Sequence, residues 1–304
     1  MLAIHGSYNW RDTRRGLTGI DGTTTVVGIV GDAVGGSLSP RLQNAAFAAV
    51  GLNWCYVAFQ VTRDRLGDAL RGLPALGIVG VNVTVPHKEA ALAYLDDITD
   101  DARSIGAVNT VQVGGGRLIG HNTDTTGLLD ALRLDGGISC EGQRAVVVGA
   151  GGAARAAAFA LAGAGAAAVV VINRNWDRAS VLADAVRRIF RCTVDAVPLD
   201  GAAVVPAVRD ATLLVQATTM GGGPQRGLSP VPAAALHSGL FVMDMVYDPQ
   251  ETALLAAARA AGCRTLGGLP MLIYQGARAF EIWTGHPAPV TVMRDAVGLP
   301  REAA

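Results

Sequence analysis

The chain has 304 residues, half of which are hydrophobic and 16% of which are charged, so it can bury a sizeable core and global disorder is excluded. Lys plus Arg and Asp plus Glu both number 25, and this balance gives no overall basic surplus of the kind that binds nucleic acid or an anionic membrane. The length permits two domains, although it would also permit one.

The first part of the chain begins with a polar, turn-rich extension and continues with alternating short strands and helices. Ser39 and Pro40 fit an N-cap followed by proline at the first helical position. The alternation is typical of a parallel sheet covered by helices. We expect the extension at residues 1–24, strands at residues 26–30, 53–61 and 79–85, and helical segments after Pro40 and at residues 66–73 and 87–95.

The chain then changes from this alternation to a hairpin. Residues 106–122 hold two apolar stretches around a run of three glycines, which predicts two paired strands. Asp124 precedes a helical run that bridges to the second half. A βαβ unit opens there at Ala145 and includes an alanine-rich helix. We expect further strands at residues 212–216 and 240–245, and a last helix at residues 271–283 that returns to the first half.

A glycine-rich turn joins the strand and the helix of that βαβ unit. Gly149, Gly151 and Ala154 fit the pattern G-x-G-x-x-A. The first glycine permits the tight turn, the second lets a pyrophosphate approach the backbone, and the small third residue lets helix and strand pack closely. The helix N-terminus adds partial positive charge. We interpret the turn as a dinucleotide site, the alternative being an α/β turn that merely needs glycine.

The end of the next strand indicates which dinucleotide binds. An acidic residue there would accept hydrogen bonds from the ribose 2′-OH of NAD, but the chain has Asn173 and Arg174, with Arg178 four residues further on. On a helical turn the two arginines would converge, and two guanidinium groups suit a 2′-phosphate. This favours NADP over NAD. The alternative is a pair of solvated arginines, one of them paired with Asp177.

A lysine and an aspartate are candidates for proton chemistry. Lys88 ends the sequence NVTVPHK, and Asp124 ends the sequence HNTD. An ammonium and a carboxylate can move a proton on or off an oxygen, so with the dinucleotide site they suggest a dehydrogenase acting on a small hydroxylated substrate. Taken alone, Lys88 could be an exposed first-turn residue and Asp124 a helix N-cap.

The cysteines, histidines and apolar tracts exclude further classes. The four cysteines are scattered without a CxxC pair, which favours buried free thiols, and the five histidines lack ligand spacing, so we expect no metal. The N-terminus lacks an apolar core of signal-peptide length, and no apolar tract approaches the ~20 residues of a membrane span. We therefore expect a cytoplasmic protein that binds neither nucleic acid nor membrane.

From about Val26 to Trp283 the chain resembles the shikimate dehydrogenase family, which comprises shikimate and quinate dehydrogenases. The motifs that carry the resemblance are, in family order, GSLSP, GVNVTVPHK, IGAVNT, NTDTTG, GAGGAARA, VYDPQETALL and LPMLIYQGARAF. The resemblance implies reversible NADP-dependent oxidation of shikimate to 3-dehydroshikimate, in the shikimate pathway. It also implies an N-terminal α/β substrate-binding domain and a Rossmann-type NADP-binding domain, with the substrate between them.

The resemblance also implies roles for single residues. Lys88 and Asp124 match the catalytic pair, in which the ammonium stabilises the developing alkoxide or takes the proton while the carboxylate orients it. Which of these the lysine does stays open. The implied substrate ligands are Ser37 and Ser39 at the carboxylate, Thr84, Asn109 and Gln275 at the ring hydroxyls and carboxylate, and Tyr247 closing the site. The expected cofactor residues are Gly149, Ala150, Gly151, Gly152, Ala153, Asn173, Arg174, Arg178, Met245 and Gly268.

Some of these residues have simpler interpretations, and the chain departs from the family pattern in places. Tyr247 could be a packing residue, and Asn82 either joins the ligands or only supports the loop. Gly36 stands where the family has histidine, and Gln43 begins Gln-Asn where it has His-Asn. Because both lie beside the expected carboxylate site, quinate and aminoshikimate stay alternative substrates. GDAV also replaces GNPI, and QATT replaces NATP.

Two further alternatives are weaker. A folate-linked dehydrogenase would not explain SLSP together with NTD, and a non-catalytic NADP or ligand sensor would be favoured by loss of the lysine and the aspartate, which are both present. We therefore predict an α/β protein that binds a small shikimate-like ring carboxylate, as a monomer or a homodimer. The predicted domains are residues 25–125, completed by residues 271–300, for the substrate and residues 126–270 for NADP.

Overall fold

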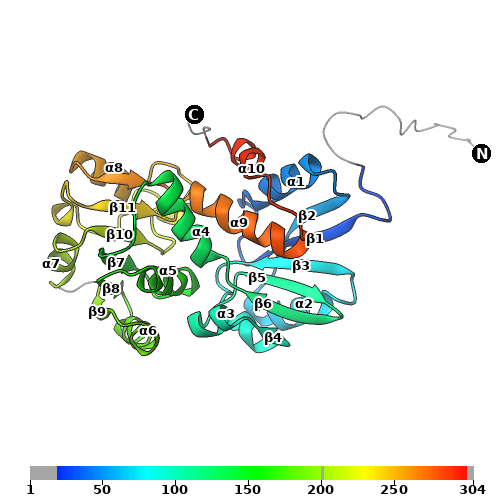
Figure 1. Cartoon of the computed structure of the whole chain (residues 1–304), viewed down its shortest axis with the longest axis horizontal. Helices are drawn as coiled ribbons and strands as arrows, with labels where there is room; N and C mark the ends of the chain where they lie inside the picture. The colour runs from blue at the N-terminus through cyan, green and yellow to red at the C-terminus, as the bar shows by residue number, and fades with distance from the viewer. Residues whose placement is uncertain (1–18, 200–201, 300–304) are drawn as a thin grey trace, which may run out of the picture.

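The computed structural model describes residues 19–199 and 202–299. Its elements form two lobes, each built on a six-stranded sheet, and the helices α4 (Asp124–Asp130) and α9 (Leu269–Thr284) pack against each other between the lobes (Figure 1). This arrangement confirms the predicted α/β fold class. The expected extension lies outside the described residues up to residue 18, and residues 19–24 form neither helix nor strand.

The first sheet has the strand order β2-β1-β3-β5-β6-β4. β1 pairs in parallel with β2 and β3, whereas β5 is antiparallel to both of its neighbours, β3 and β6. The parallel pairing expected for the first three strands is confirmed, and the predicted hairpin places β5 beside β3 in the opposite direction. The strands are β1 (Thr25–Gly31), β2 (Trp54–Gln60), β3 (Ile78–Val83), β4 (Asp97–Ile98), β5 (Thr110–Gly114) and β6 (Arg117–His121).

Two local predictions in this lobe were wrong. Ser39 does not cap α1 but is its first residue, because Leu38 before it already has the helical angles φ −81° and ψ −9°. In the segment 87–95 only a 3₁₀ turn forms. Nε2 of the buried His87 ring lies 2.7 Å from the Val61 carbonyl oxygen, which holds the start of the segment on the sheet. The tighter 3₁₀ turn follows at Ala90–Tyr94. The helical elements of the lobe are α1 (Ser39–Ala49), α2 (Leu66–Gly72), α3 (Asp100–Ile105) and 3₁₀ turns at Arg63–Arg65 and Ala90–Tyr94.

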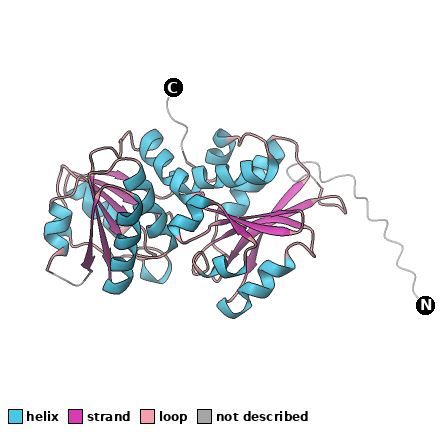
Figure 2. Cartoon of the chain, turned by 60° about the horizontal axis from the view of Figure 1, so that its bottom comes forward, coloured by secondary structure: helices cyan, strands magenta, loops and turns pink. Residues whose placement is uncertain are grey.

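The second sheet is entirely parallel, in the order β12-β11-β10-β7-β8-β9, and helices lie on both sides of it (Figure 2). Strands that helices cover on both faces have continuous apolar sequences. Ligands of such sheets bind where the strand order reverses, which is between β7 and β10 in this sheet. The Rossmann prediction is confirmed. The elements are β7 (Arg144–Val148), α5 (Gly152–Gly163), β8 (Ala168–Asn173), α6 (Trp176–Ile189), β9 (Thr193–Pro198), α7 (Val204–Arg209), β10 (Leu213–Gln216), β11 (Phe241–Asp244), α8 (Ala253–Ala260) and β12 (Arg264–Leu266).

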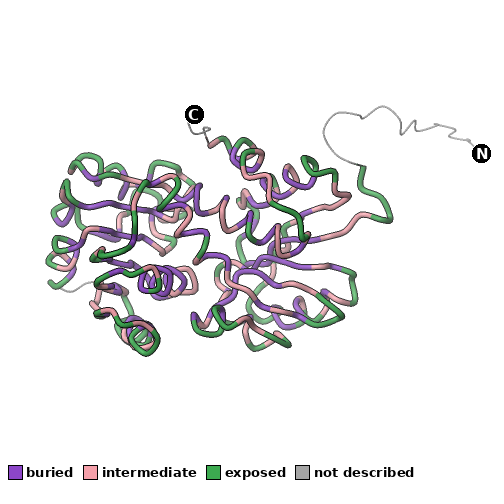
Figure 3. The backbone as a smooth tube through the Cα atoms, viewed as in Figure 1, coloured by how far each residue is buried: buried purple, intermediate pink, exposed green. Residues whose placement is uncertain are grey.

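The C-terminal helix returns to the first lobe as predicted, although it begins two residues earlier. Phe280 and Trp283 of α9 share a buried cluster with β1 and α1, and the Trp283 indole donates a hydrogen bond to the Val111 carbonyl at 3.1 Å. A Cβ atom at Gly80 would collide with that indole, so glycine permits the close approach. A further helix, α10 (Val290–Ala296), packs on α1. The buried backbone follows the strands of both lobes (Figure 3).

Two class-level features are visible in the described residues. Within residues 19–199 and 202–299, none of the helices has the length and apolar character needed to cross a bilayer. The four cysteines all carry free thiols; Cys140 and Cys263 are buried, and Cys55 and Cys192 are half-buried.

Candidate active site

Lys88 and Asp124 form an ion pair at the start of α4, between the lobes. The Lys88 ammonium donates to Oδ2 of Asp124 at 2.5 Å, with the side chains 14% and 5% exposed. The Lys88 carbonyl also accepts the N–H of Val108 at 2.9 Å, which holds the turn after β3. Asp124 is therefore not an N-cap but the first residue of the helix, with its carboxylate committed to a charge-assisted hydrogen bond.

Lys88 is also distinguished by its residue type. It is the only lysine in the chain, and the other 24 of the 25 Lys and Arg residues are arginines. An arginine stays protonated under all ordinary conditions, whereas a lysine can give up its proton. The composition therefore singles out Lys88 for proton chemistry, and this signal was present in the sequence.

Asn109 connects the ion pair to α9. Its Nδ2 donates to Oδ1 of Asp124 at 2.8 Å and to Oε1 of Gln275 at 3.3 Å, and its Oδ1 accepts the N–H of Thr123 at 2.8 Å. Both carboxylate oxygens of Asp124 are thereby occupied, so the side chain cannot rotate away from Lys88. Four of the predicted site residues, contributed by four separate segments of the chain, come together here.

Tyr56, which the sequence did not single out, links this cluster to α1. The Tyr56 hydroxyl donates to Oδ1 of Asn82 at 2.7 Å, and the Asn82 amide donates to the Asn109 carbonyl at 3.2 Å. Burial raises the pKa of Tyr56 well above its usual value, and a hydrogen bond with the Ser39 side chain opposes the rise. In the sequence Tyr56 has only the pattern of a core residue in a strand, so nothing marked it as part of a site.

The remaining predicted substrate residues lie at the edge of this cluster. The Ser37 hydroxyl accepts the N–H of Ser39 at 3.2 Å. Burial raises the pKa of Tyr247, against the effect of hydrogen bonds with the Ser37 side chain and the Leu38 backbone, so a residue that follows β11 in the second lobe reaches the serine turn of the first. Thr84 lies directly after β3, and none of the described residues hydrogen-bonds to its hydroxyl.

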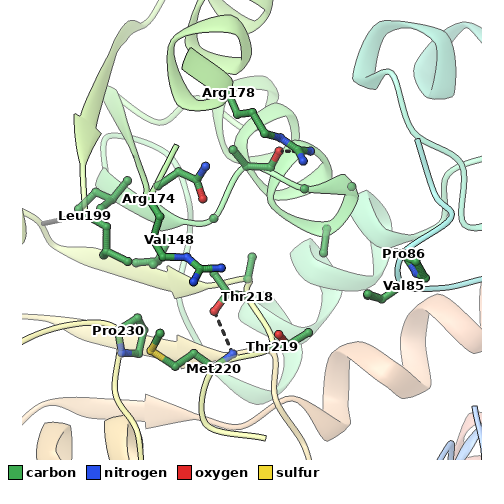
Figure 4. A pocket seen from close by; sticks show the side chains of 18 of the residues that line it. Val85, Pro86, Val148, Arg174, Arg178, Leu199, Thr218, Thr219, Met220 and Pro230 are labelled. Carbon is green, nitrogen blue, oxygen red and sulfur yellow. Dashed lines mark hydrogen bonds between the residues drawn. The ribbon is translucent and has the colours of Figure 1, made fainter. Parts of the chain in front are cut away.

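A pocket of about 280 Å³ opens at the carboxyl ends of β7, β8 and β10 (Figure 4). Lys88 belongs to its lining, so the ion pair lies at its edge. Eight of the predicted cofactor residues line the pocket, namely Gly149, Ala150, Gly151, Gly152, Ala153, Asn173, Arg174 and Arg178. The pocket is therefore the candidate dinucleotide site.

The backbone of the glycine turn has the features of a phosphate cradle. Gly149 has φ +119°, which favours glycine, and a Cβ atom added at Gly151 would meet nothing within 4 Å, so the backbone there is open to a ligand. α5 begins at the next residue and presents its N-terminus to that space. A Cβ atom at Gly152 would lie 2.7 Å from Cβ of Lys88, so glycine lets α5 approach the lysine.

The charges around the pocket also suit a dinucleotide with an extra phosphate. Its lining includes four cationic side chains, those of Arg63, Lys88, Arg174 and Arg178, and one carboxylate, that of Glu89. This surplus of positive charge attracts phosphate groups. The open cradle and the two arginines beyond β8 fit NADP.

The two arginines lie differently from the prediction. Arg174 is not on a helical turn, because α6 begins only at Trp176, and the two guanidinium groups lie apart, Arg178 beside the Ala150 carbonyl and Arg174 toward Thr218 (Figure 4). Asp177 pairs with neither of them. The partner of Arg178 is Glu89 of the other lobe, at 2.5 Å, which a local sequence pattern could not indicate.

Met245 and Gly268 contact each other but are not among the residues that line the pocket. A Cβ atom at Gly268 would collide with the Met245 carbonyl, so only glycine fits.

Asp244, next to Met245, is fully buried. Burial raises its pKa from 3.8 to about 6, and hydrogen bonds from the Val246 N–H and the Thr252 hydroxyl oppose the shift.

Two departures from the family pattern have structural roles. Gln216 of the QATT segment is buried, and its amide donates to the Met220 carbonyl and accepts the Thr218 N–H, both at 2.8 Å, which shapes the pocket wall. Gln43 is buried and donates to the Gly276 carbonyl at 2.8 Å, so it ties α1 to α9 beside Gln275. Both glutamines hold backbone near the site.

Three protein-family models match the chain. A model described as the shikimate dehydrogenase substrate binding domain matches residues 29–111, one described as shikimate / quinate 5-dehydrogenase matches residues 133–218, and one described as the shikimate 5′-dehydrogenase C-terminal domain matches residues 268–297. The first lies within the first lobe, the second spans β7 to β10 and includes the glycine turn, and the third covers α9 and α10.

Individual relatives are similar over nearly the whole chain. The NADP(+)-dependent shikimate dehydrogenase of Methanopyrus kandleri is 48% identical over 279 residues, which cover 91% of this chain and 96% of that protein. A crystal structure of a shikimate dehydrogenase in complex with NADP+ is 39% identical, with a TM-score of 0.84 over 93% of this chain and 98% of the other. The Thermus thermophilus enzyme in complex with NADP(H) and shikimate is 40% identical, with a TM-score of 0.81 over 90% and 98%.

Proposed function

The chain belongs to the shikimate dehydrogenase family, and we propose from this that it catalyses the reversible, NADP-dependent oxidation of shikimate to 3-dehydroshikimate. The observation that carries the proposal is the buried Lys88–Asp124 pair at the edge of the pocket that the glycine turn lines. Oxidation of a secondary alcohol needs a group that handles the hydroxyl proton beside a site for the hydride acceptor.

Lys88 acts on the hydroxyl that is oxidised. NADP+, when bound, supplies the acceptor for the hydride that leaves the carbinol carbon. In the oxidation the hydroxyl proton passes to the neutral amine form of Lys88 while the C–H electron pair leaves as hydride and the C=O bond forms, and in the reverse reaction the Lys88 ammonium returns the proton to the oxygen. Asp124 holds the ammonium with one carboxylate oxygen while Asn109 occupies the other, so the donor is positioned before the substrate arrives.

The substrate ring lies in this proposal between the serine turn, α9 and the ion pair. The hydrogen bond between Asn109 and Gln275 and the packing of Tyr247 on the serine turn support this placement. The proposed ligands are Ser37, Ser39 and Tyr247 for the carboxylate, and Thr84, Asn109 and Gln275 for the ring hydroxyls and carboxylate.

The proposed domain boundaries place the substrate residues and the cofactor residues in different domains. We propose residues 25–125 with residues 271–300 as the substrate domain and residues 126–270 as the NADP domain, a division supported by the packing of α9 on the first sheet. The catalytic role of Lys88 would therefore be exercised where the two domains meet. The cytoplasmic location and the assembly as a monomer or a homodimer stay predictions.

The test is the rate at which reduced cofactor appears with shikimate, quinate or aminoshikimate, each supplied with NADP+ or NAD+. We expect shikimate with NADP+ to give the highest kcat/KM. A preference for quinate or aminoshikimate would leave the proposed mechanism unchanged. It would mean that Gly36 and Gln43, which differ from the family pattern, set the substrate specificity. If no combination gives turnover while NADP+ still binds, the chain is a sensor and the proposal is wrong.

A further inference from the structure

Glu89 and Arg178 form an ion pair across the two lobes, in the lining of the cofactor pocket. Glu89 follows Lys88 in the first lobe, and Arg178 lies in α6 of the second. Nη2 of Arg178 donates to Oε1 of Glu89 at 2.5 Å and to the Ala150 carbonyl at 3.0 Å. The Arg178 and Glu89 side chains are 50% and 43% exposed, so a ligand in the pocket can reach them.

The Nη2 group is the one that bidentate binding requires. A guanidinium grips a phosphate with two parallel N–H bonds along one of two edges, Nη1 with Nη2 or Nε with Nη2, and both edges contain Nη2. In Arg178 the two hydrogens of Nη2 are committed to Glu89 and Ala150. Neither edge is open to a phosphate until Glu89 releases it.

We propose that Glu89 is a specificity-determining residue that competes with the 2′-phosphate of the cofactor for Arg178; this rests on the proposed use of NADP. NAD lacks that phosphate, so its binding leaves the ion pair in place. NADP must displace the carboxylate before Arg178 can bind it with two hydrogen bonds. Glu89 therefore lowers the affinity for NADP and narrows the preference for NADP over NAD.

A second contact between the lobes lets this exchange happen without separating them. Nε of Arg155 in α5 donates to the Ile105 carbonyl at the end of α3. That bond does not involve Glu89, and Gly152 also keeps α5 against Lys88. When Arg178 changes partner, the Glu89–Arg178 pair breaks while these two contacts keep the lobes together.

The Arg178 guanidinium, once Glu89 has released it, has a suitable place to meet the phosphate. Beside the pocket lies a hollow whose lining is Ala150, Gly151, Asn173, Arg174, Asn175 and Arg178. Arg174 and the two asparagine amides supply further donors there, and Glu89 is not part of that lining. A 2′-phosphate in the hollow would thus meet two guanidinium groups.

The test is calorimetric titration of the full-length protein with two probes, adenosine 2′,5′-bisphosphate and adenosine 5′-monophosphate. Glu89→Gln should bind the bisphosphate about two- to fivefold more tightly than wild type, the range of an exposed ion pair, and the monophosphate equally well. Asp68→Asn is the matched control, because it neutralises an exposed carboxylate that pairs with Arg65 and Arg71 on the surface. It should change neither affinity.

Arg178→Ala separates competition from simple charge repulsion. In that background Glu89→Gln should no longer change the affinity for the bisphosphate. An unchanged or weaker affinity in Glu89→Gln alone, or a gain that persists without Arg178, overturns the inference. A wild type that binds both nucleotides equally rejects the NADP proposal as well, whereas a wild type that prefers the bisphosphate, without a gain in Glu89→Gln, rejects the competition alone.

Discussion

The Lys88–Asp124 pair should contribute to stability and to turnover in ways that mutations can separate. Replacing Lys88 with Met leaves the Asp124 carboxylate 5% exposed, with the Asn109 amide as its side-chain partner. Breaking one half of a buried pair typically costs about 3–5 kcal/mol of unfolding free energy. Because the proton-handling group is lost as well, turnover should fall by about 10²–10⁴-fold.

The double variant Lys88→Met, Asp124→Asn removes both charges. An asparagine at position 124 can still accept the hydrogen bond that Asn109 donates to Oδ1, and no buried ion is left unpaired. We expect the double variant to be more stable than Lys88→Met by about 2 kcal/mol or more. Turnover should stay as low as in Lys88→Met, since neither change restores a proton-handling group.

Urea denaturation of wild type, both single variants and the double variant measures the coupling free energy, and turnover is followed on the same preparations. In the single variants the m-value serves as the control, because it should equal that of wild type if only stability has changed. A coupling energy below about 0.5 kcal/mol, the scatter of independent sites, would refute the reasoning, since it would mean that the pair is not desolvated.

Two further predictions concern buried charges elsewhere. Burial raises the pKa of Asp244 from 3.8 to about 6, so the folded protein favours the neutral carboxyl. The shift adds about 3 kcal/mol to the free energy of unfolding. This contribution is complete below about pH 4 and is lost as the pH rises through about 6. Asp244→Asn cannot ionise, so its stability relative to wild type should increase over that pH window in urea titrations, and a difference that is constant with pH would contradict this. Arg294 pairs with Asp135 at 2.8 Å, with side chains 10% and 9% exposed. Arg294→Met should therefore lower the unfolding free energy by about 3–5 kcal/mol, and Arg294→Met with Asp135→Asn by less; equal losses in thermal melts would rule out a buried pair.

The parts of the fold that the sequence predicted well are those that local chemistry determines. The glycine turn lies between β7 and α5 as expected, because Gly149 needs a positive φ and Gly152 needs to be small. The hairpin β5–β6 forms where the run of glycines predicts it. In each case the residues that determine the structure are neighbours in the chain, so their pattern is readable without the fold.

The wrong predictions concern partners from distant segments. Ser39 looked like an N-cap because of Pro40, yet the helical conformation already extends to Leu38 and the Ser39 side chain meets Tyr56 instead. Asp177 was the nearest candidate partner for the arginines, but Arg178 pairs with Glu89, which lies 89 residues away in the chain. Such choices depend on how the lobes meet, and a local pattern cannot contain that information.

The turn after β3 contributes one residue to the proposed substrate site and the next residue to the cofactor pocket. Lys88 holds Asp124 beside the substrate residues, and the very next residue, Glu89, holds Arg178 at the cofactor pocket. Lys88 is further held by the Val108 N–H on its carbonyl and by α5, which Gly152 lets approach. In the proposed exchange Glu89 can therefore change partner while Lys88, the neighbouring residue and the proposed catalytic lysine, stays fixed. For this reason we expect changes at Glu89 to act on cofactor affinity and changes at Lys88 on the chemical step, although the two side chains share one turn.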